Sequence, residues 1–187
     1  MKYLEMYKSI LSEFEEVFER LDQDGLKELM QEIKKHHRIF VIGVGREGLA
    51  ARGFAMRLMH MGKEVHWVWD DTTPNMGHGD LLIAVSGGGQ VGHINYVCEQ
   101  AKSAGAFLYV VTGSPSGKTA KELADKVFFV PASVYRGTDD VVPSFQPMGN
   151  LFEQCLFIIF DMVIMLLVEE SEELSFEKMS KRHRNVE

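Results

Sequence analysis

The feature that most limits the fold of this chain is the alternation of short apolar runs with segments of helical spacing. The runs that have the length and composition of strands are Arg38–Ile42, Glu64–Trp69, Asp80–Val85, Ala106–Val111 and Lys126–Val130. Strands that are apolar almost throughout belong to parallel sheets covered by helices on both faces. The alternation therefore predicts an α/β fold, a three-layer αβα sandwich around a five-stranded parallel sheet with right-handed connections.

Apolar residues at intervals of three and four predict the helices. Those between strands are Gly48–Met61, Val91–Ser103 and Lys118–Ala124. Outside the sheet they are Leu4–Leu21, Leu26–Lys35, Gln146–Glu169 and Glu172–Lys181. The sequence has no linker or internal repeat, so we expect a single domain over 1–187. Its parts are N-terminal helices in 1–36, a sheet core in 37–131, and C-terminal helices with a tail in 146–187.

Charge and cysteine content narrow the function classes. The 20 Lys+Arg and 27 Asp+Glu residues give a net charge of −7, which disfavours nucleic acid as a partner. Cys98 and Cys155 have neither disulfide nor metal spacing, so a reducing cytoplasm is the expected compartment. The first ten residues do not resemble a signal peptide. The most apolar stretch, Leu156–Val168, contains Asp161 and is short for a membrane span, so we expect a buried helix.

Two glycine-rich turns follow predicted strands. The first is Gly43–Gly48, which contains Arg46 and Glu47, and the second is Ser86–Gln90, with Gly87, Gly88 and Gly89. Both turns are expected at the carboxyl edge of the sheet, where their N–H groups and Arg46 can meet an anion. Each turn can also be purely structural. A dinucleotide site that uses Asp70 is disfavoured, because an isolated GxGxxG spacing is a weak signal.

Glu153 is a candidate general base. It lies near the start of a helix that is otherwise apolar, after Pro147, which suits a first helical turn. The acid can simply stabilise the helix dipole. Alternatively, its apolar neighbours Leu151, Phe152 and Leu156 raise its pKa and suit it to proton abstraction.

The remaining polar residues form no familiar catalytic or metal pattern. No histidine pair has zinc spacing, so no metal site is predicted. His36 and His37 precede the first strand and are expected at the surface. Ser86 lies in a G-x-S-x-G-like turn without an evident His and Asp partner, which disfavours a hydrolase.

Several segments resemble one family in order along nearly the whole chain. They are Gly43–Arg46, Phe54–Gly62, Thr73–Pro74, Gly79–Leu81, Gln146–Gln154 and His183–Glu187. The sequence resembles the SIS-domain sugar isomerases, and among them the 6-phospho-3-hexuloisomerases. The stretches Met56–Gly62 and Gln146–Gln154 are the most specific parts of the resemblance.

The resemblance implies a SIS domain with flavodoxin-like strand order that assembles as a tetramer. It implies isomerisation of 3-hexulose 6-phosphate and fructose 6-phosphate through an enediol, without a metal or organic cofactor. Glu153 matches the family's catalytic base. His183 matches a tail histidine that reaches a neighbouring subunit's site and serves as a second proton carrier. Arg46 matches an arginine that faces the sugar or phosphate.

The chain departs from the family where hydroxyl groups hold the phosphate. Glu47 and Gly88 replace serines, and Val91 replaces a threonine. The candidate substrate contacts are Arg46, Glu47, Ser86, Gly87, Gly88, Gly89 and Gln90, and a phosphate would be held by backbone N–H groups, Ser86 and Arg46. Glu47 also adds a negative charge beside the expected phosphate. At 4 Å and an effective dielectric of 20, two such charges repel each other by roughly 4 kcal/mol. Two alternatives therefore stay open: an isomerase of an unphosphorylated or amino sugar that contacts Glu47, and a non-catalytic sugar-phosphate-binding module.

The helix that carries Glu153 also bears on assembly. Its segment Leu151–Val168 is apolar on nearly every side, so it must be buried on more than one side. One domain of 187 residues has little material to cover it, so we expect a homo-oligomer, either a dimer or a tetramer.

Overall fold

Five parallel strands form one sheet in the order β2-β1-β3-β4-β5. The computed structural model describes residues 2–137 and 139–186. The strands are β1 (Arg38–Ile42), β2 (Glu64–Trp67), β3 (Leu81–Val85), β4 (Phe107–Thr112) and β5 (Lys126–Phe129). β1 pairs with β2 on one side and β3 on the other, so the strand order reverses between β1 and β3. The predicted αβα fold and its flavodoxin-like order are confirmed, and ligands of such sheets bind at this reversal.

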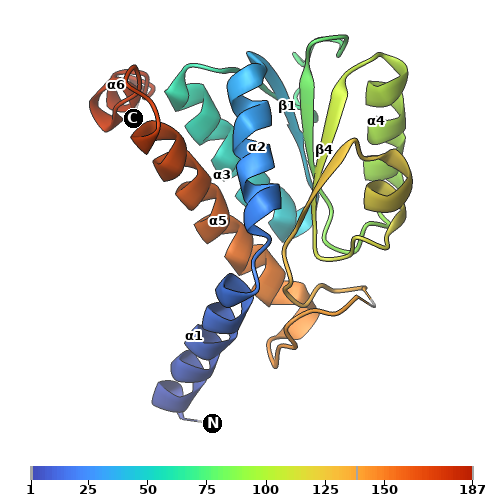
Figure 1. Cartoon of the computed structure of the whole chain (residues 1–187), viewed down its shortest axis with the longest axis vertical. Helices are drawn as coiled ribbons and strands as arrows, with labels where there is room; N and C mark the ends of the chain where they lie inside the picture. The colour runs from blue at the N-terminus through green and yellow to red at the C-terminus, as the bar shows by residue number, and fades with distance from the viewer. Residues whose placement is uncertain (1, 138, 187) are drawn as a thin grey trace.

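Helices cover both faces of this sheet, and the N-terminal helix extends beyond it (Figure 1). The helix bounds are close to those predicted. The helices are α1 (Tyr3–Glu19), α2 (Gln23–Lys35), α3 (Gly45–Met61), α4 (Gly92–Ser103), α5 (Asn150–Glu169) and α6 (Phe176–Lys181). A π-helical turn occupies Thr119–Leu123, and a 3₁₀ turn at Pro147–Gly149 precedes α5. α3 begins three residues before the predicted Gly48, because residues 45–47 already form its first turn.

The side chains of the sheet alternate between two apolar cores. On one face, Ile39, Ile83 and Tyr109 pack with buried residues of α2, α3 and α5. On the other face, Phe40 and Leu82 pack with α4 and the π-helical turn. Burial of both faces explains why the strands are apolar throughout.

α5 lies within the predicted helix Gln146–Glu169 and contains the most apolar stretch, Leu156–Val168. Residues Pro147–Glu169 form a 23-residue helical segment with a mean hydropathy of 2.3, long and apolar enough to cross a membrane. Half of its most apolar window is buried inside the chain, and the core helix of a soluble protein meets the same criteria. Phe157, Ile158 and Met165 remain exposed on this helix.

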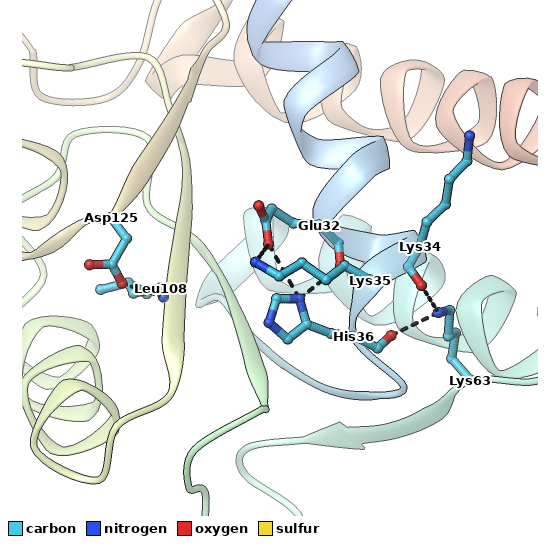
Figure 2. Close-up of polar contacts among 7 residues, drawn as sticks. All are labelled: Glu32, Lys34, Lys35, His36, Lys63, Leu108 and Asp125. Carbon is cyan, nitrogen blue, oxygen red and sulfur yellow. Dashed lines mark hydrogen bonds and ion pairs between the residues drawn. The ribbon is translucent and has the colours of Figure 1, made fainter.

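The prediction that His36 lies at the surface is wrong, although His37 is exposed. The His36 side chain is buried, and its ring lies 5.8 Å from the Phe107 ring. Its Nδ1 is 2.9 Å from the carbonyl oxygen of Glu32, and Lys63 Nζ donates to the His36 carbonyl at 2.7 Å (Figure 2). These contacts hold the C-terminal end of α2 against the start of β1.

A partly buried ion pair fixes the amino edge of the sheet. Arg38 Nε and Nη2 donate to the two carboxylate oxygens of Asp80 at 2.7 and 2.6 Å, and the Gly77 N–H donates to the same carboxylate at 2.7 Å. Burial alone would raise the pKa of Asp80, but the bonds from Arg38 and Gly77 outweigh it and lower that pKa. The pair joins the start of β1 to the residue before β3.

We expect Asp80→Asn to lower the free energy of unfolding by about 1–3 kcal/mol at pH 7, because it leaves Arg38 without its charged partner. A lowered folded-state pKa stabilises above the unfolded carboxyl pKa of about 4, and this contribution is lost as the pH falls through the folded value. Urea unfolding between pH 7 and pH 3 measures both effects, with the exposed Asp71→Asn as the control. Equal stability of the two variants at pH 7 would show that the pair contributes nothing.

Candidate functional site

Three segments meet at the carboxyl edge of the sheet, beside the reversal of strand order. They are the first turn of α3 with Arg46 and Glu47, the turn Ser86–Gly89 after β3, and the first turns of α5 with Glu153. The first glycine turn allows α3 to start close to β1. A Cβ on Gly48 would lie 2.9 Å from the carbonyl oxygen of Gly43, and Gly45 has a φ of 56°. The turn therefore brings Arg46 and Glu47 to this edge.

Glu153 and Arg46 form an ion pair across this junction. Arg46 Nε lies 2.7 Å from Glu153 Oε2, although the two groups are not aligned as a hydrogen bond. The Glu153 side chain is 14% exposed and the Arg46 side chain 57%. Burial raises the pKa of Glu153, and the positive charge of Arg46 opposes that rise. A largely buried carboxylate with a raised pKa suits a general base.

Glu47 contacts the second glycine turn. Its Oε2 accepts a hydrogen bond from the Gly87 N–H at 3.0 Å. A Cβ on Gly87 would lie 2.4 Å from Glu47 Oε1, so only glycine allows this approach. The pKa of Glu47 is raised to about 7, mainly by burial; the hydrogen bond from the Gly87 N–H lowers this pKa, and the charge of Glu153 raises it. Two carboxyl groups with raised pKa values thus lie near each other.

The other predicted contacts of this turn differ in accessibility. Ser86 is fully buried, and its Oγ has no hydrogen-bond partner among the residues that the structure describes. Gly89 is buried with a φ of 64°, and its N–H donates to the Ser86 carbonyl. Gln90 is exposed. Thr112 Oγ1 donates to the carbonyl oxygens of Ser86 and Gly87 and ties the turn to β4.

The sequence predicts a loop at Pro131–Pro143 but not that this loop covers the Ser86–Gly89 turn. A Cβ on Gly88 would lie 2.2 Å from the carbonyl oxygen of Arg136, and a Cβ on Gly89 would lie 2.9 Å from Gly117 Cα. Asp139 holds the loop in place, because its carboxylate accepts hydrogen bonds from the hydroxyls of Ser114 and Ser116. The serines that follow β4 were the signal available for this contact.

We expect Gly88→Ala to lower the free energy of unfolding by about 1–3 kcal/mol, because the new methyl group collides with backbone. Gly92→Ala is the matched control, since a Cβ there has nothing within 4 Å. Thermal and urea unfolding of both variants measure the difference. Equal stability of Gly88→Ala and the control would show that the loop around Arg136 accommodates the methyl group without any loss in the free energy of unfolding. A serine at position 88, as in the family pattern, meets the same carbonyl.

A second contact missed by sequence reasoning positions the start of α5. The carboxylate of Glu13 accepts hydrogen bonds from Ser144 Oγ at 2.7 Å, the Phe145 N–H at 3.0 Å and Gln146 Nε2 at 2.9 Å. These residues lead directly into the turn before Glu153. Glu13 lies on α1, more than 130 residues away in sequence, and nothing in its local pattern distinguishes it from the other acids of that helix.

His183 does not lie near Glu153 within one chain. Its ring is 5.2 Å from the ring of His60, at the end of α3, and Arg182 Nη1 donates to the His60 carbonyl. About 20 Å of helix separates His60 from Glu47 along α3. Figure 1 places α6 at the end of α5 that is opposite to its start. His183 also lines a cavity of about 430 Å³ together with Arg57 and Asp161.

Among residues 2–137 and 139–186, no group of three or more His, Cys, Asp or Glu side chains could hold a metal ion. Cys98 and Cys155 are free and buried, and burial raises the pKa of each thiol to about 12.

The fold and the site define a class of protein. The model of the SIS domain family matches residues 32–136, and this chain belongs to that family. The 3-hexulose-6-phosphate isomerase of Bacillus subtilis (strain 168) is 36% identical over all of both chains. That of Mycobacterium gastri is 38% identical over 90% of this chain and 83% of its own.

A solved structure agrees with these relatives. A hypothetical protein from Methanococcus jannaschii, for which the crystal structure infers a molecular function of 3-hexulose-6-phosphate isomerase, is 29% identical. It superposes with a TM-score of 0.83 and covers 98% of this chain and 99% of its own. The resemblance noted in the sequence is therefore confirmed.

Proposed function

We propose that this chain is a sugar-phosphate isomerase that interconverts 3-hexulose 6-phosphate and fructose 6-phosphate. The observation that carries the proposal is the position of Glu153, a largely buried carboxyl group with a raised pKa at the carboxyl edge of the sheet. The full-length similarity to proteins named 3-hexulose-6-phosphate isomerase supports the same reaction.

The reaction moves a carbonyl group from C3 to C2 through an enediol. Glu153 removes the proton from C2, the C2–H electrons form the C2–C3 double bond, and the C3 carbonyl becomes an enediol oxygen. After a proton passes between the two oxygens, Glu153 returns its proton to C3. Arg46 holds the Glu153 carboxylate in place before substrate binds. The expected chemistry needs acid and base groups only, so no metal or organic cofactor is part of the proposal.

The proton transfer between the oxygens needs a second group, and we assign it to His183. Because His183 lies at the other end of its own chain, this role requires the tail of a neighbouring subunit. Exposed apolar side chains supply material for such an interface. They are Tyr3, Leu4 and Leu11 on α1, and Phe157, Ile158 and Met165 on α5.

We expect a homo-oligomer, a tetramer or a dimer, when the protein is measured by light scattering at micromolar concentration. The expected mass is a multiple of 21.2 kDa. A mass equal to that of one chain would contradict the assembly and would leave His183 without a neighbouring site.

The free cysteines agree with a cytoplasmic protein, in which thiols stay reduced.

The activity is tested by supplying 3-hexulose 6-phosphate and measuring fructose 6-phosphate. Formation of product by the purified chain supports the proposal, and no product at high enzyme concentration contradicts it.

Glu47 favours a second candidate, the isomerisation of an unphosphorylated or amino sugar, because its carboxyl group already accepts the hydrogen bond of the Gly87 N–H. Turnover of fructosamine or fructose, with none of the phosphate ester, would select that candidate.

A further inference from the structure

We propose that Glu47 is an internal competitor of the substrate's phosphate group, and that a phosphate ester binds the Gly87 turn only when Glu47 releases the Gly87 N–H. The inference rests on the proposed function, since it takes the substrate to be a phosphate ester. It adds a specificity-determining role for a partly buried acid that the isomerisation itself does not use.

The first argument is that the N–H of Gly87 already has an anionic partner. Glycine turns after parallel strands bind anions through backbone N–H groups. In this chain the Gly87 N–H donates to Glu47 Oε2 at 3.0 Å, and the Gly89 N–H is used within the turn by the Ser86 carbonyl. A phosphate oxygen that takes the Gly87 N–H must displace the carboxyl group.

The second argument is that the turn cannot move away from Glu47. The Gly88 side of the turn faces the Arg136 carbonyl, and Gly89 lies against Gly117. Thr112 Oγ1, at the end of β4, donates to the carbonyl oxygens of Ser86 and Gly87. These contacts hold the turn in place. The flexible Glu47 side chain must therefore move when a phosphate group binds the turn.

The third argument is electrostatic. The ionisable groups around Glu47 are Arg46 on its own helix and Glu153 from α5, and these two are paired with each other. On the loop that covers the turn, Asp139 is bound by serine hydroxyls and Arg136 is an exposed residue whose guanidinium lies over the Tyr135 ring. In the structure Arg46 is paired with Glu153 and the Arg136 guanidinium lies over Tyr135, so neither positive charge is engaged with Glu47.

Displacement of Glu47 by a doubly charged phosphate therefore favours its neutral form, and Glu47 takes up a proton from solvent. Its pKa is already raised to about 7 by burial, so the uptake occurs above that pH. The affinity for a phosphate ester should fall by up to tenfold per pH unit above 7. An unphosphorylated sugar has no charge to compete with and should show neither effect.

The test is calorimetric titration of fructose 6-phosphate at pH 7 and pH 8.5, in buffers that differ in ionisation enthalpy. We expect the wild type to take up about one proton per ligand at pH 8.5. Glu47→Gln keeps a neutral acceptor for the Gly87 N–H, and Glu47→Ser removes the occupant. Both should bind at least about tenfold tighter at pH 8.5 without proton uptake, and Glu47→Ser should bind tightest. The exposed Glu172→Gln is the matched control.

Equal affinities and equal proton uptake in the wild type and both Glu47 variants would overturn the proposal, as would absence of binding in all of them. A similar gain for fructose, which has no phosphate, would also overturn it, because the effect would then be steric. If the Glu47 pattern appears while no variant isomerises 3-hexulose 6-phosphate, the competitor role holds and the proposed reaction fails.

Discussion

Glu153→Gln should reduce kcat for 3-hexulose 6-phosphate isomerisation by about 10²- to 10⁴-fold, the contribution expected of a general base. The amide preserves the size of the side chain but cannot accept the C2 proton. KM should change little, because the substitution leaves the proposed phosphate contacts at the Gly87 turn in place. Initial rates at several substrate concentrations separate these two effects.

Two further measurements separate catalysis from folding in this variant. Glu153→Asp withdraws the carboxylate by one methylene and should retain more activity than Glu153→Gln, with an unchanged melting temperature. Because the pKa of Glu153 is raised, the activity of the wild type should rise with pH through a value above that of an ordinary glutamate. Activity of Glu153→Gln close to that of the wild type would show that another group removes the proton.

Phe54→Ala should lower the free energy of unfolding by about 3–5 kcal/mol, the usual cost of deleting a buried aromatic ring. Phe54 on α3 stacks on Phe160 of α5, with ring centroids 4.3 Å apart and an interplanar angle of 8°. Both residues are 2% exposed. The alanine leaves a cavity between the two helices that carry the site.

The same substitution should also affect activity, since α3 carries Arg46 and α5 carries Glu153. Displacement of the helices lengthens the ion pair that holds the base, so kcat should fall even at temperatures where the variant is fully folded. Met56→Ala, on an exposed side chain of the same helix, is the matched control for both measurements. A variant that loses stability but keeps full kcat would show that packing between α3 and α5 does not position the base.

Local sequence patterns predicted most of the fold. The strands are apolar on both faces because both faces are buried, so their composition alone identified a parallel sheet. The glycines at positions 43, 45 and 48 predicted the tight turn into α3, because close backbone approach and a positive φ both favour glycine. Glu153 was predicted because an acid in the first turns of a largely apolar helix is visible without any knowledge of its neighbours.

The features that sequence reasoning missed depend on contacts between distant segments. Glu47 meets Gly87 across 40 residues, and Glu13 meets Ser144 across 131, so neither pairing has a local signature. His36 looked like a surface residue, but the ring of Phe107 and the end of α2 cover it. The position of Glu47 was predicted to matter for the ligand, whereas its bond to the turn became visible only in three dimensions.

The central claim, that Glu153 transfers a substrate proton during isomerisation, is tested most directly by solvent exchange. The protein converts 3-hexulose 6-phosphate in deuterium oxide, and NMR measures deuterium at C3 of the fructose 6-phosphate formed. The account predicts deuterium at C3 with the wild type, because the Glu153 carboxyl group exchanges with solvent before it returns the proton, and no product beyond background with Glu153→Gln. Deuterated product formed at an undiminished rate by Glu153→Gln would contradict it.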